Sequence, residues 1–151
     1  MLEEDYFMSN APKKPLLGGS PEQREAFRQY TIAFSTQDLK NIRQYFNDDL
    51  HFELGNLATL DGPEAFIEFY RKQAKTIRET LSINHMVADE GGIVADITAK
   101  FTAIADPFPD SHFQLEKGKS LEGRYFVYYL LRDGKMSSIR VAAVSGPEPV
   151  P

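Results

Sequence analysis

The stretch IVADITAKFTA, residues 93–103, decides the fold class. Its odd-numbered residues, from Ile93 to Ala103, are all apolar, whereas Asp96 and Lys100 are among the even-numbered residues. Successive side chains of a strand point to opposite faces of a sheet. This alternation therefore predicts a strand with one face in the core.

Turn residues and prolines divide the rest of the second half of the chain into further strands. The dipeptide Asp133-Gly134 is typical of a tight hairpin turn, and Gly91-Gly92 marks another turn. Pro107 and Pro109 indicate a loop. The predicted strands cover residues 81–87, 93–103, 125–131 and 136–144.

Three helices are predicted before this run of strands, with one short strand over residues 50–54 between them. Ser20 can cap the first helix, because Pro21 follows at the first helical position. Asp38 can cap a short second helix, and Gly62-Pro63 begins a third. We therefore expect an α+β fold, in which three N-terminal helices cover one face of a curved, mostly antiparallel β-sheet.

The chain of 151 residues is expected to hold one domain. Residues 1–19 contain prolines and glycines that disfavour a helix, so they are expected to form an extended arm. The single domain is expected over residues 20–146, and a flexible tail over residues 147–151.

Composition excludes several classes of protein. The net charge of −5 argues against a nucleic-acid partner, and no apolar run is long enough to cross a membrane. The absence of cysteine excludes disulfides and thiol nucleophiles. The three histidines lack the spacing of a metal site, and no nucleotide-binding motif is present, so no cofactor is expected. We expect a cytoplasmic protein.

Three segments resemble the nuclear transport factor two-like superfamily, which includes SnoaL-like polyketide cyclases and ketosteroid isomerase. They are the opening helix pair and first strand over residues 27–49, the third helix over residues 62–70 and the last hairpin over residues 130–141. The resemblance covers roughly residues 21–146. It implies a cone-shaped fold that encloses a pocket, and commonly a homodimer formed through the outer face of the sheet.

The resemblance also implies site residues. Tyr30 matches the tyrosine of the oxyanion hole in ketosteroid isomerase, and Tyr70 matches the tyrosine bonded to it, so we expect their hydroxyls to share a hydrogen bond or a partner. The two catalytic acids of that isomerase are not present, because Leu54 and Val127 match those positions. The residues expected to bind the substrate are Phe34, Leu54, Phe66, Val127 and Tyr129.

The general base is left with three candidates, Lys100, Asp96 and His51. Alternation alone places Lys100 in solvent, whereas the family register places it inside the cone. We expect it inside, because a charged side chain is disfavoured in a dimer interface. His51 shares one face of its strand with Glu53, which could orient it.

These residues predict a cofactor-independent acid–base enzyme of isomerase, cyclase, dehydratase or lyase type. Its substrate is expected to be a small, mostly apolar cyclic or aromatic molecule. The alternative is a non-catalytic module of the same fold that binds a small ligand or dimerises. A protein-interaction domain of the transport-factor kind is a third possibility.

Overall fold

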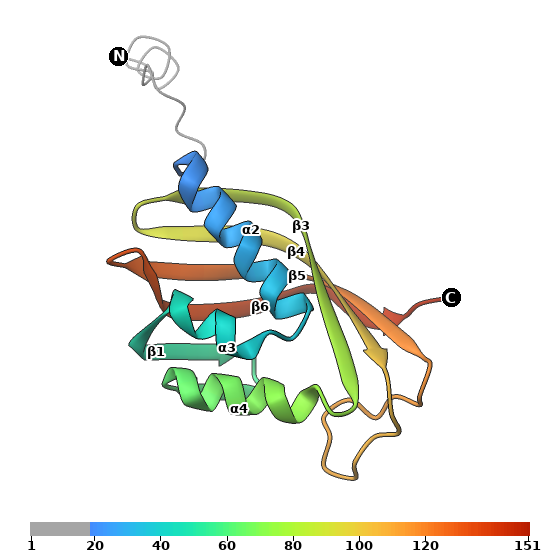
Figure 1. Cartoon of the computed structure of the whole chain (residues 1–151). Coiled ribbons are helices and arrows are strands. Elements are labelled where there is room, and N and C mark those ends of the chain that lie inside the picture. Colours follow the sequence, from blue (N-terminus) through green and yellow to red (C-terminus); the bar gives the residue numbers. More distant parts are fainter. Residues whose placement is uncertain (1–18) are drawn as a thin grey trace.

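The computed structural model describes residues 19–151, so the expected arm lies outside the described residues except for Gly19. A curved sheet of six strands, in the order β2-β1-β6-β5-β4-β3, carries the helices (Figure 1). The elements are α2 (Pro21–Ser35), α3 (Leu39–Ile42), the 3-10 helix η1 (Arg43–Tyr45), β1 (Phe46–Leu54), β2 (Ala58–Asp61), α4 (Pro63–Gln73), β3 (Ile77–Asp89), β4 (Gly92–Ala103), β5 (Ser120–Arg132) and β6 (Lys135–Pro149).

The sheet is mixed. Neighbouring strands are antiparallel except β1 and β6, which run parallel, with Phe52 opposite Ile139. The α+β class and the mostly antiparallel sheet agree with the sequence. The strand expected between the helices is present as β1, which begins earlier than residue 50, whereas β2 was not expected, and both strands are full members of the sheet.

Helix α2 begins as its sequence predicts. The Ser20 side chain accepts a hydrogen bond from the Gln23 backbone N–H at 3.1 Å, and Pro21 is the first helical residue. The Gln23 side chain donates to the Asp89 carbonyl at 2.6 Å instead of returning to Ser20. The start of α2 is thereby tied to the end of β3.

The end of α2 is tied to the same strand. Ser35 Oγ accepts a hydrogen bond from the Leu81 backbone N–H at 2.9 Å, and the Gln37 side chain donates to the Ile77 carbonyl at 3.3 Å. β3 is an edge strand, so these side chains satisfy backbone groups that no neighbouring strand can reach. The two bonds hold β3 on either side of Glu79.

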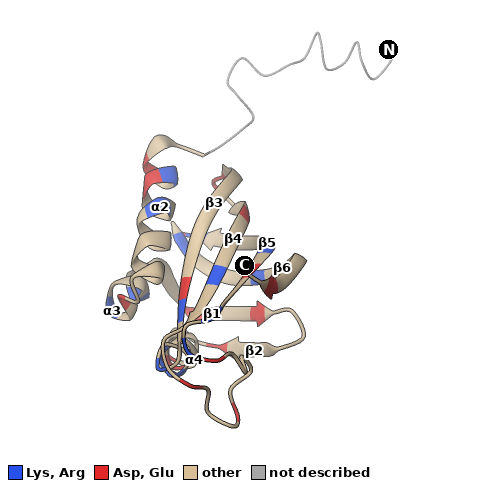
Figure 2. Cartoon of the chain, turned by 90° about the vertical axis from the view of Figure 1, so that its right-hand side faces the viewer, with Lys and Arg blue, Asp and Glu red and all other residues tan. Residues whose placement is uncertain are grey.

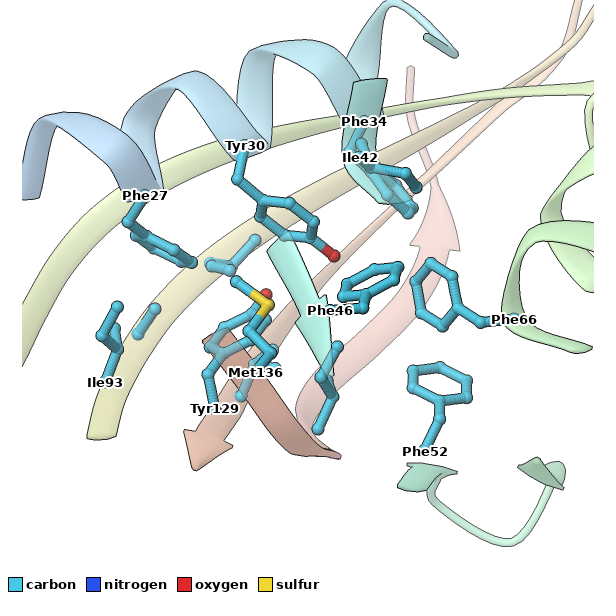
Figure 3. Packing of buried hydrophobic residues seen from close by; sticks show 14 of the residues in the cluster. Phe27, Tyr30, Phe34, Ile42, Phe46, Phe52, Phe66, Ile93, Tyr129 and Met136 are labelled. Atoms are coloured by element: carbon cyan, nitrogen blue, oxygen red, sulfur yellow. The ribbon is translucent and has the colours of Figure 1, made fainter. Parts of the chain in front are cut away.

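Aromatic side chains fill the core between the helices and the inner face of the sheet. Phe66 of α4 packs edge-on against Phe46 and Phe52 of β1, with ring centroids 4.9 Å apart in both pairs (Figure 3). Tyr30 reaches in from α2, with its ring 6.0 Å from that of Phe46. Both helices therefore cover one face of the sheet.

The last strand is longer than expected. β6 continues to Pro149, and Glu148 lies opposite Glu122 of β5. The expectation of a flexible tail from residue 147 is therefore wrong for residues 147–149, because β5 supplies a pairing partner. The hairpin before β6 turns at Asp133 and Gly134, whose φ angles are both positive, as the Asp-Gly sequence predicts.

The outer face of the sheet carries both charged and apolar side chains. Figure 2 shows charged segments on strands as well as on the helices, and Lys100 of β4 and Glu122 of β5 are exposed on the outer face. Large apolar side chains on this face are exposed, among them Val94, Phe126, Tyr128 and Leu130. Over residues 19–151, the helices are too short or too polar to cross a membrane.

Candidate active site

A cavity of about 310 Å³ lies between the helices and the inner face of the sheet. Its walls come from α2, α4, β1, β3, β4, β5 and β6, together with the loop that joins β4 to β5. Nine phenylalanine and tyrosine side chains line it, so its surface is mostly apolar. The five residues expected to bind the substrate all line this cavity, namely Phe34, Leu54, Phe66, Val127 and Tyr129.

Glu79 is the only acidic residue among residues 19–151 that lines the cavity. It lies opposite Phe101 of β4, whose side chain is buried, and so shares the inner face of the sheet. Gln73 Nε2 donates a hydrogen bond to Glu79 Oε1 at 2.9 Å. Burial raises the pKa of Glu79 from 4.5 to about 7, although the Gln73 hydrogen bond opposes this shift.

Three tyrosines line the same cavity as this carboxyl. Tyr30 of α2, Tyr70 of α4 and Tyr129 of β5 are buried and line the cavity. Burial raises the pKa of all three phenols above the ordinary value of 10, and the pKa values of Tyr30 and Tyr70 lie well above it. The negative charge of Glu79 adds to each of these shifts. All three hydroxyls are therefore neutral donors at physiological pH.

The expected link between Tyr30 and Tyr70 is not formed. Neither hydroxyl makes a hydrogen bond to the other or to any residue in the described part of the chain, and the same is true of Tyr129. No side-chain polar atom of residues 19–151 is both buried and unpaired, so the hydroxyls are accessible from the cavity. They are free to donate to a bound molecule.

A glycine makes room for a fourth tyrosine on the cavity wall. Gly123 and Tyr125 lie on the inner face of β5, and a Cβ at Gly123 would lie 2.8–3.1 Å from atoms of the Tyr125 ring and hydroxyl. The ring therefore rests against the backbone of Gly123. Burial raises the pKa of Tyr125, with a smaller contribution from the Glu79 charge.

The loop between β4 and β5 closes one side of the cavity. His112 lines the cavity, and its ring stacks on Phe69 of α4 with centroids 5.6 Å apart. The loop is also held to α4 by an ion pair between Lys72 and Asp110, 2.7 Å long. Burial and the Lys72 charge both lower the pKa of His112, so this side chain is neutral at pH 7.

None of the three side chains proposed as the base from the sequence lies in the cavity. Lys100 is exposed on the outer face of β4, so the expectation that it lies inside the cone is wrong. The reason is the strict alternation of β4, which buries Ile97, Ala99 and Phe101 on the other face. The alternation of buried and exposed residues in β4 therefore predicts the position of Lys100 correctly, whereas the strand register implied by the family resemblance does not.

Asp96 and His51 are also on the outer face. Asp96 pairs with Arg124, whose Nε lies 2.9 Å from Oδ1, and this pairing lowers the pKa of Asp96 to about 2. His51 lies between Asp61 at 2.7 Å and Glu53 at 3.0 Å, and both carboxylates raise its pKa. Both side chains are occupied by partners outside the cavity.

No group of three or more histidine, aspartate or glutamate residues in the described part of the chain is placed to hold a metal ion.

The sequence matches a known domain family. The model of the SnoaL-like domain matches residues 26–139, which is most of the chain. The chain belongs to the SnoaL-like domain family. This confirms the resemblance of its sequence to the nuclear transport factor two-like superfamily, to which SnoaL-like proteins belong. No curated protein matches its sequence.

Solved structures share the fold of this SnoaL-like protein at low sequence identity. A proposed polyketide cyclase from Xanthomonas campestris is 16% identical, with a TM-score of 0.68, and the match covers 79% of this chain and 87% of that one. A second proposed polyketide cyclase, from Pseudomonas putida, is 19% identical, with a TM-score of 0.66 and coverage of 80% and 90%. An epoxide hydrolase from M. tuberculosis is 14% identical, with a TM-score of 0.66 and coverage of 81% and 82%. These likenesses show the fold alone.

Glu79 is the site residue that the sequence analysis missed in this SnoaL-like protein. The signal that could have found it is its place in the alternation of β3. Glu79 has the same parity as Ile77, Leu81 and Ile83, which are apolar. An acidic residue at a core-facing position of a strand indicates a carboxyl that enters the core or a cavity.

Proposed function

We propose that this protein is a cofactor-independent acid–base enzyme that moves a proton on a small, mostly apolar cyclic or aromatic substrate. The observation that carries the proposal is Glu79, a carboxyl in an apolar cavity whose pKa is raised to about 7. A general base works best when its pKa lies near the working pH. At pH 7 a large fraction of the Glu79 side chains is ionised and able to accept a proton.

The cavity offers both partners that such a step needs. Gln73 holds one carboxylate oxygen of Glu79 and leaves Oε2 without a hydrogen bond to the described residues. This oxygen takes a proton from a carbon next to a carbonyl or similar group. The negative charge then moves to the substrate oxygen, where a hydroxyl of Tyr30, Tyr70 or Tyr129 donates to it. If Glu79 returns the proton to a different atom of the substrate, the reaction is an isomerisation. If the substrate instead loses a leaving group, the reaction is a dehydration or another lyase reaction.

The apolar walls support the substrate class. Phe34, Leu54, Phe66 and Val127 contribute only apolar side chains to the cavity wall. A ring bound there loses contact with water, and each Å² of apolar surface buried contributes roughly 25 cal/mol. Two of the proteins that share the fold are named as proposed polyketide cyclases, and a third is named as an epoxide hydrolase.

The experiment is hydrogen exchange of 2-tetralone in deuterated water, followed by proton NMR. This probe is a neutral, apolar ring ketone with an acidic C–H beside the carbonyl. We expect the protein to accelerate exchange, with a rate that rises as the pH passes about 7. The Glu79→Gln variant should lose at least about 100-fold of the acceleration, because general-base catalysis contributes 10²–10⁴-fold.

The matched control is Glu122→Gln, which makes the same change at an exposed position on the outer face of β5. It should exchange 2-tetralone as the unmodified protein does. Unchanged exchange in Glu79→Gln would contradict the proposal. Binding of 2-tetralone without any exchange would favour the alternative, a non-catalytic module that binds a small ligand.

We further propose that the protein is a cytoplasmic homodimer. Val94 lies opposite Tyr128 across β4 and β5, and Phe126 lies on the same outer face. Phe126 and Tyr128 are each 47% exposed. Contiguous exposed apolar side chains of this kind mark interaction surfaces, and a second copy of the chain offers the same surface in return.

A further inference from the structure

We propose that the cavity binds apolar amines as ammonium ions, with Glu79 as the charge partner and the tyrosine and phenylalanine rings as the surrounding cage. This is a second class of ligand for the cavity. It does not depend on proton transfer or on any turnover.

The charges of the cavity wall favour a cation. Glu79 is the only acidic residue in the wall, and no lysine or arginine among residues 19–151 lines it. An ionised carboxylate that is shielded from water is unfavourable unless a charged or hydrogen-bonding partner compensates it. Gln73 supplies one neutral donor to Oε1. An ammonium group at Oε2 supplies the missing charge.

The rings of the wall also favour a cation. Nine phenylalanine and tyrosine side chains line the cavity, and Tyr30, Tyr70 and Tyr129 lie near enough to Glu79 for its charge to raise their pKa values. A cation over the face of an aromatic ring is attracted by the ring's quadrupole. The phenol oxygens can also accept hydrogen bonds from the N–H groups of an ammonium ion.

The cationic groups near the wall do not oppose this. Lys72 of α4 is paired with Asp110 at 2.7 Å and does not line the cavity. His112 is in the wall, but burial and the Lys72 charge lower its pKa and leave it neutral above pH 7. Arg78, the neighbour of Glu79 in β3, is exposed and does not line the cavity.

The same arrangement disfavours an anion. A carboxylate ligand in the cavity would lie near Glu79 without any lysine or arginine from the wall to bind it. Two carboxylates in one shielded site repel, so one of them must take up a proton before the ligand can bind. The expected order of affinity is therefore amine, then the matched neutral molecule, then the matched acid.

Isothermal titration calorimetry with three probes of similar shape tests this order. The probes are 2-phenylethylamine, 2-phenylethanol and 3-phenylpropanoate, each titrated into the full chain at pH 8, where Glu79 is mostly ionised. We expect the amine to bind about tenfold more tightly than the alcohol, and the acid to bind more weakly than the alcohol. An alcohol that binds as tightly as the amine, or an amine that does not bind, overturns the proposal.

The variant Glu79→Gln isolates the charge, because glutamine has nearly the same shape. We expect it to lose the preference for the amine and to keep the affinity for the alcohol, which also shows that the cavity is intact. The control Glu122→Gln should keep the full preference. A preference for the amine that survives in Glu79→Gln overturns the proposal, whether or not the protein exchanges 2-tetralone.

Discussion

Two opposing effects act on the pKa of Glu79, and their balance decides whether its carboxyl is ionised near neutral pH. Removal from water favours the protonated acid, while the Gln73 N–H favours the ionised form. The first influence is the larger, so the pKa rises to about 7. Asp96 shows the reverse balance on the outer face, because Arg124 and Asn84 stabilise its charge and lower its pKa to about 2.

The raised pKa of Glu79 predicts a pH-dependent loss of stability. The folded protein holds this proton up to about pH 7, whereas the unfolded chain releases it near 4.5. The contribution to stability is therefore fully present below pH 4.5 and is lost as the pH rises through 7. The difference between a pKa of 4.5 in the unfolded chain and about 7 in the folded protein corresponds to about 3 kcal/mol of stability.

Urea unfolding of the protein and of Glu79→Gln between pH 4 and pH 8 measures this effect. Glutamine cannot ionise, so the variant should be more stable at pH 8 by about 3 kcal/mol, and this advantage should shrink toward pH 4. An advantage that does not change with pH would show that Glu79 has an ordinary pKa in the folded protein.

The site residues differ in how well the sequence predicted them. Tyr30 and Tyr70 were expected at the site from the family resemblance and Tyr129 as a substrate-binding residue, and all three line the cavity. The register implied by the family resemblance placed Lys100 inside the cone. The alternation of β4 gives its observed position instead, exposed on the outer face. The hydrogen bond from Gln73 to Glu79 joins a helix to a strand, and no local pattern encodes such a contact.

At the scale of elements, the contact between α2 and β3 positions Glu79. Ser35 accepts from the Leu81 N–H and Gln37 donates to the Ile77 carbonyl, so the two bonds flank Glu79 along the strand. The helix caps at Ser20 and Asp38 follow from the sequence alone, because a cap bonds to the backbone three residues away. The docking of α2 on an edge strand needs the complete sheet and could not be predicted.

Replacing Ser35 tests this positioning. Ser35→Ala leaves the Leu81 N–H without its acceptor, so we expect a loss of about 1 kcal/mol in the free energy of unfolding. Exchange of 2-tetralone should fall as well, because the strand that carries Glu79 is less firmly held. Urea unfolding and the exchange assay measure the two effects.

Ser137→Ala is the control, because the Ser137 hydroxyl bonds to the Leu130 carbonyl and Ser137 does not line the cavity. It should leave the exchange rate unchanged. Equal rates in Ser35→Ala and the unmodified protein would show that this contact does not position the base.

At the scale of the whole molecule, the inner and outer faces of one sheet serve different purposes. Helices α2 and α4 cover the inner face and leave a cavity, whereas exposed apolar side chains of β4 and β5 occupy the outer face. The order of helices and strands in the sequence was sufficient to predict the α+β class and the family. It did not predict that α4 follows two strands, or that β6 extends to Pro149.

The proposed dimer predicts a change of mass in one variant. Phe126→Asp replaces one of the exposed apolar side chains of the outer face with a charge, and it should convert the dimer to a monomer at micromolar concentration. Ile32→Asp is the matched control, because Ile32 is 49% exposed but belongs to α2. Light scattering measures both. A monomeric unmodified protein, or a dimer that survives Phe126→Asp, would contradict the proposed interface.

The charge state of Glu79 decides whether the cavity contains a usable base, and carboxyl ¹³C NMR measures that state directly. The Glu79 signal is identified as the one that disappears in Glu79→Gln. We expect its chemical shift to titrate with a pKa of about 7. A midpoint near the ordinary value of 4.5 would mean that water reaches the carboxyl freely, and it would contradict the assignment of Glu79 as the base.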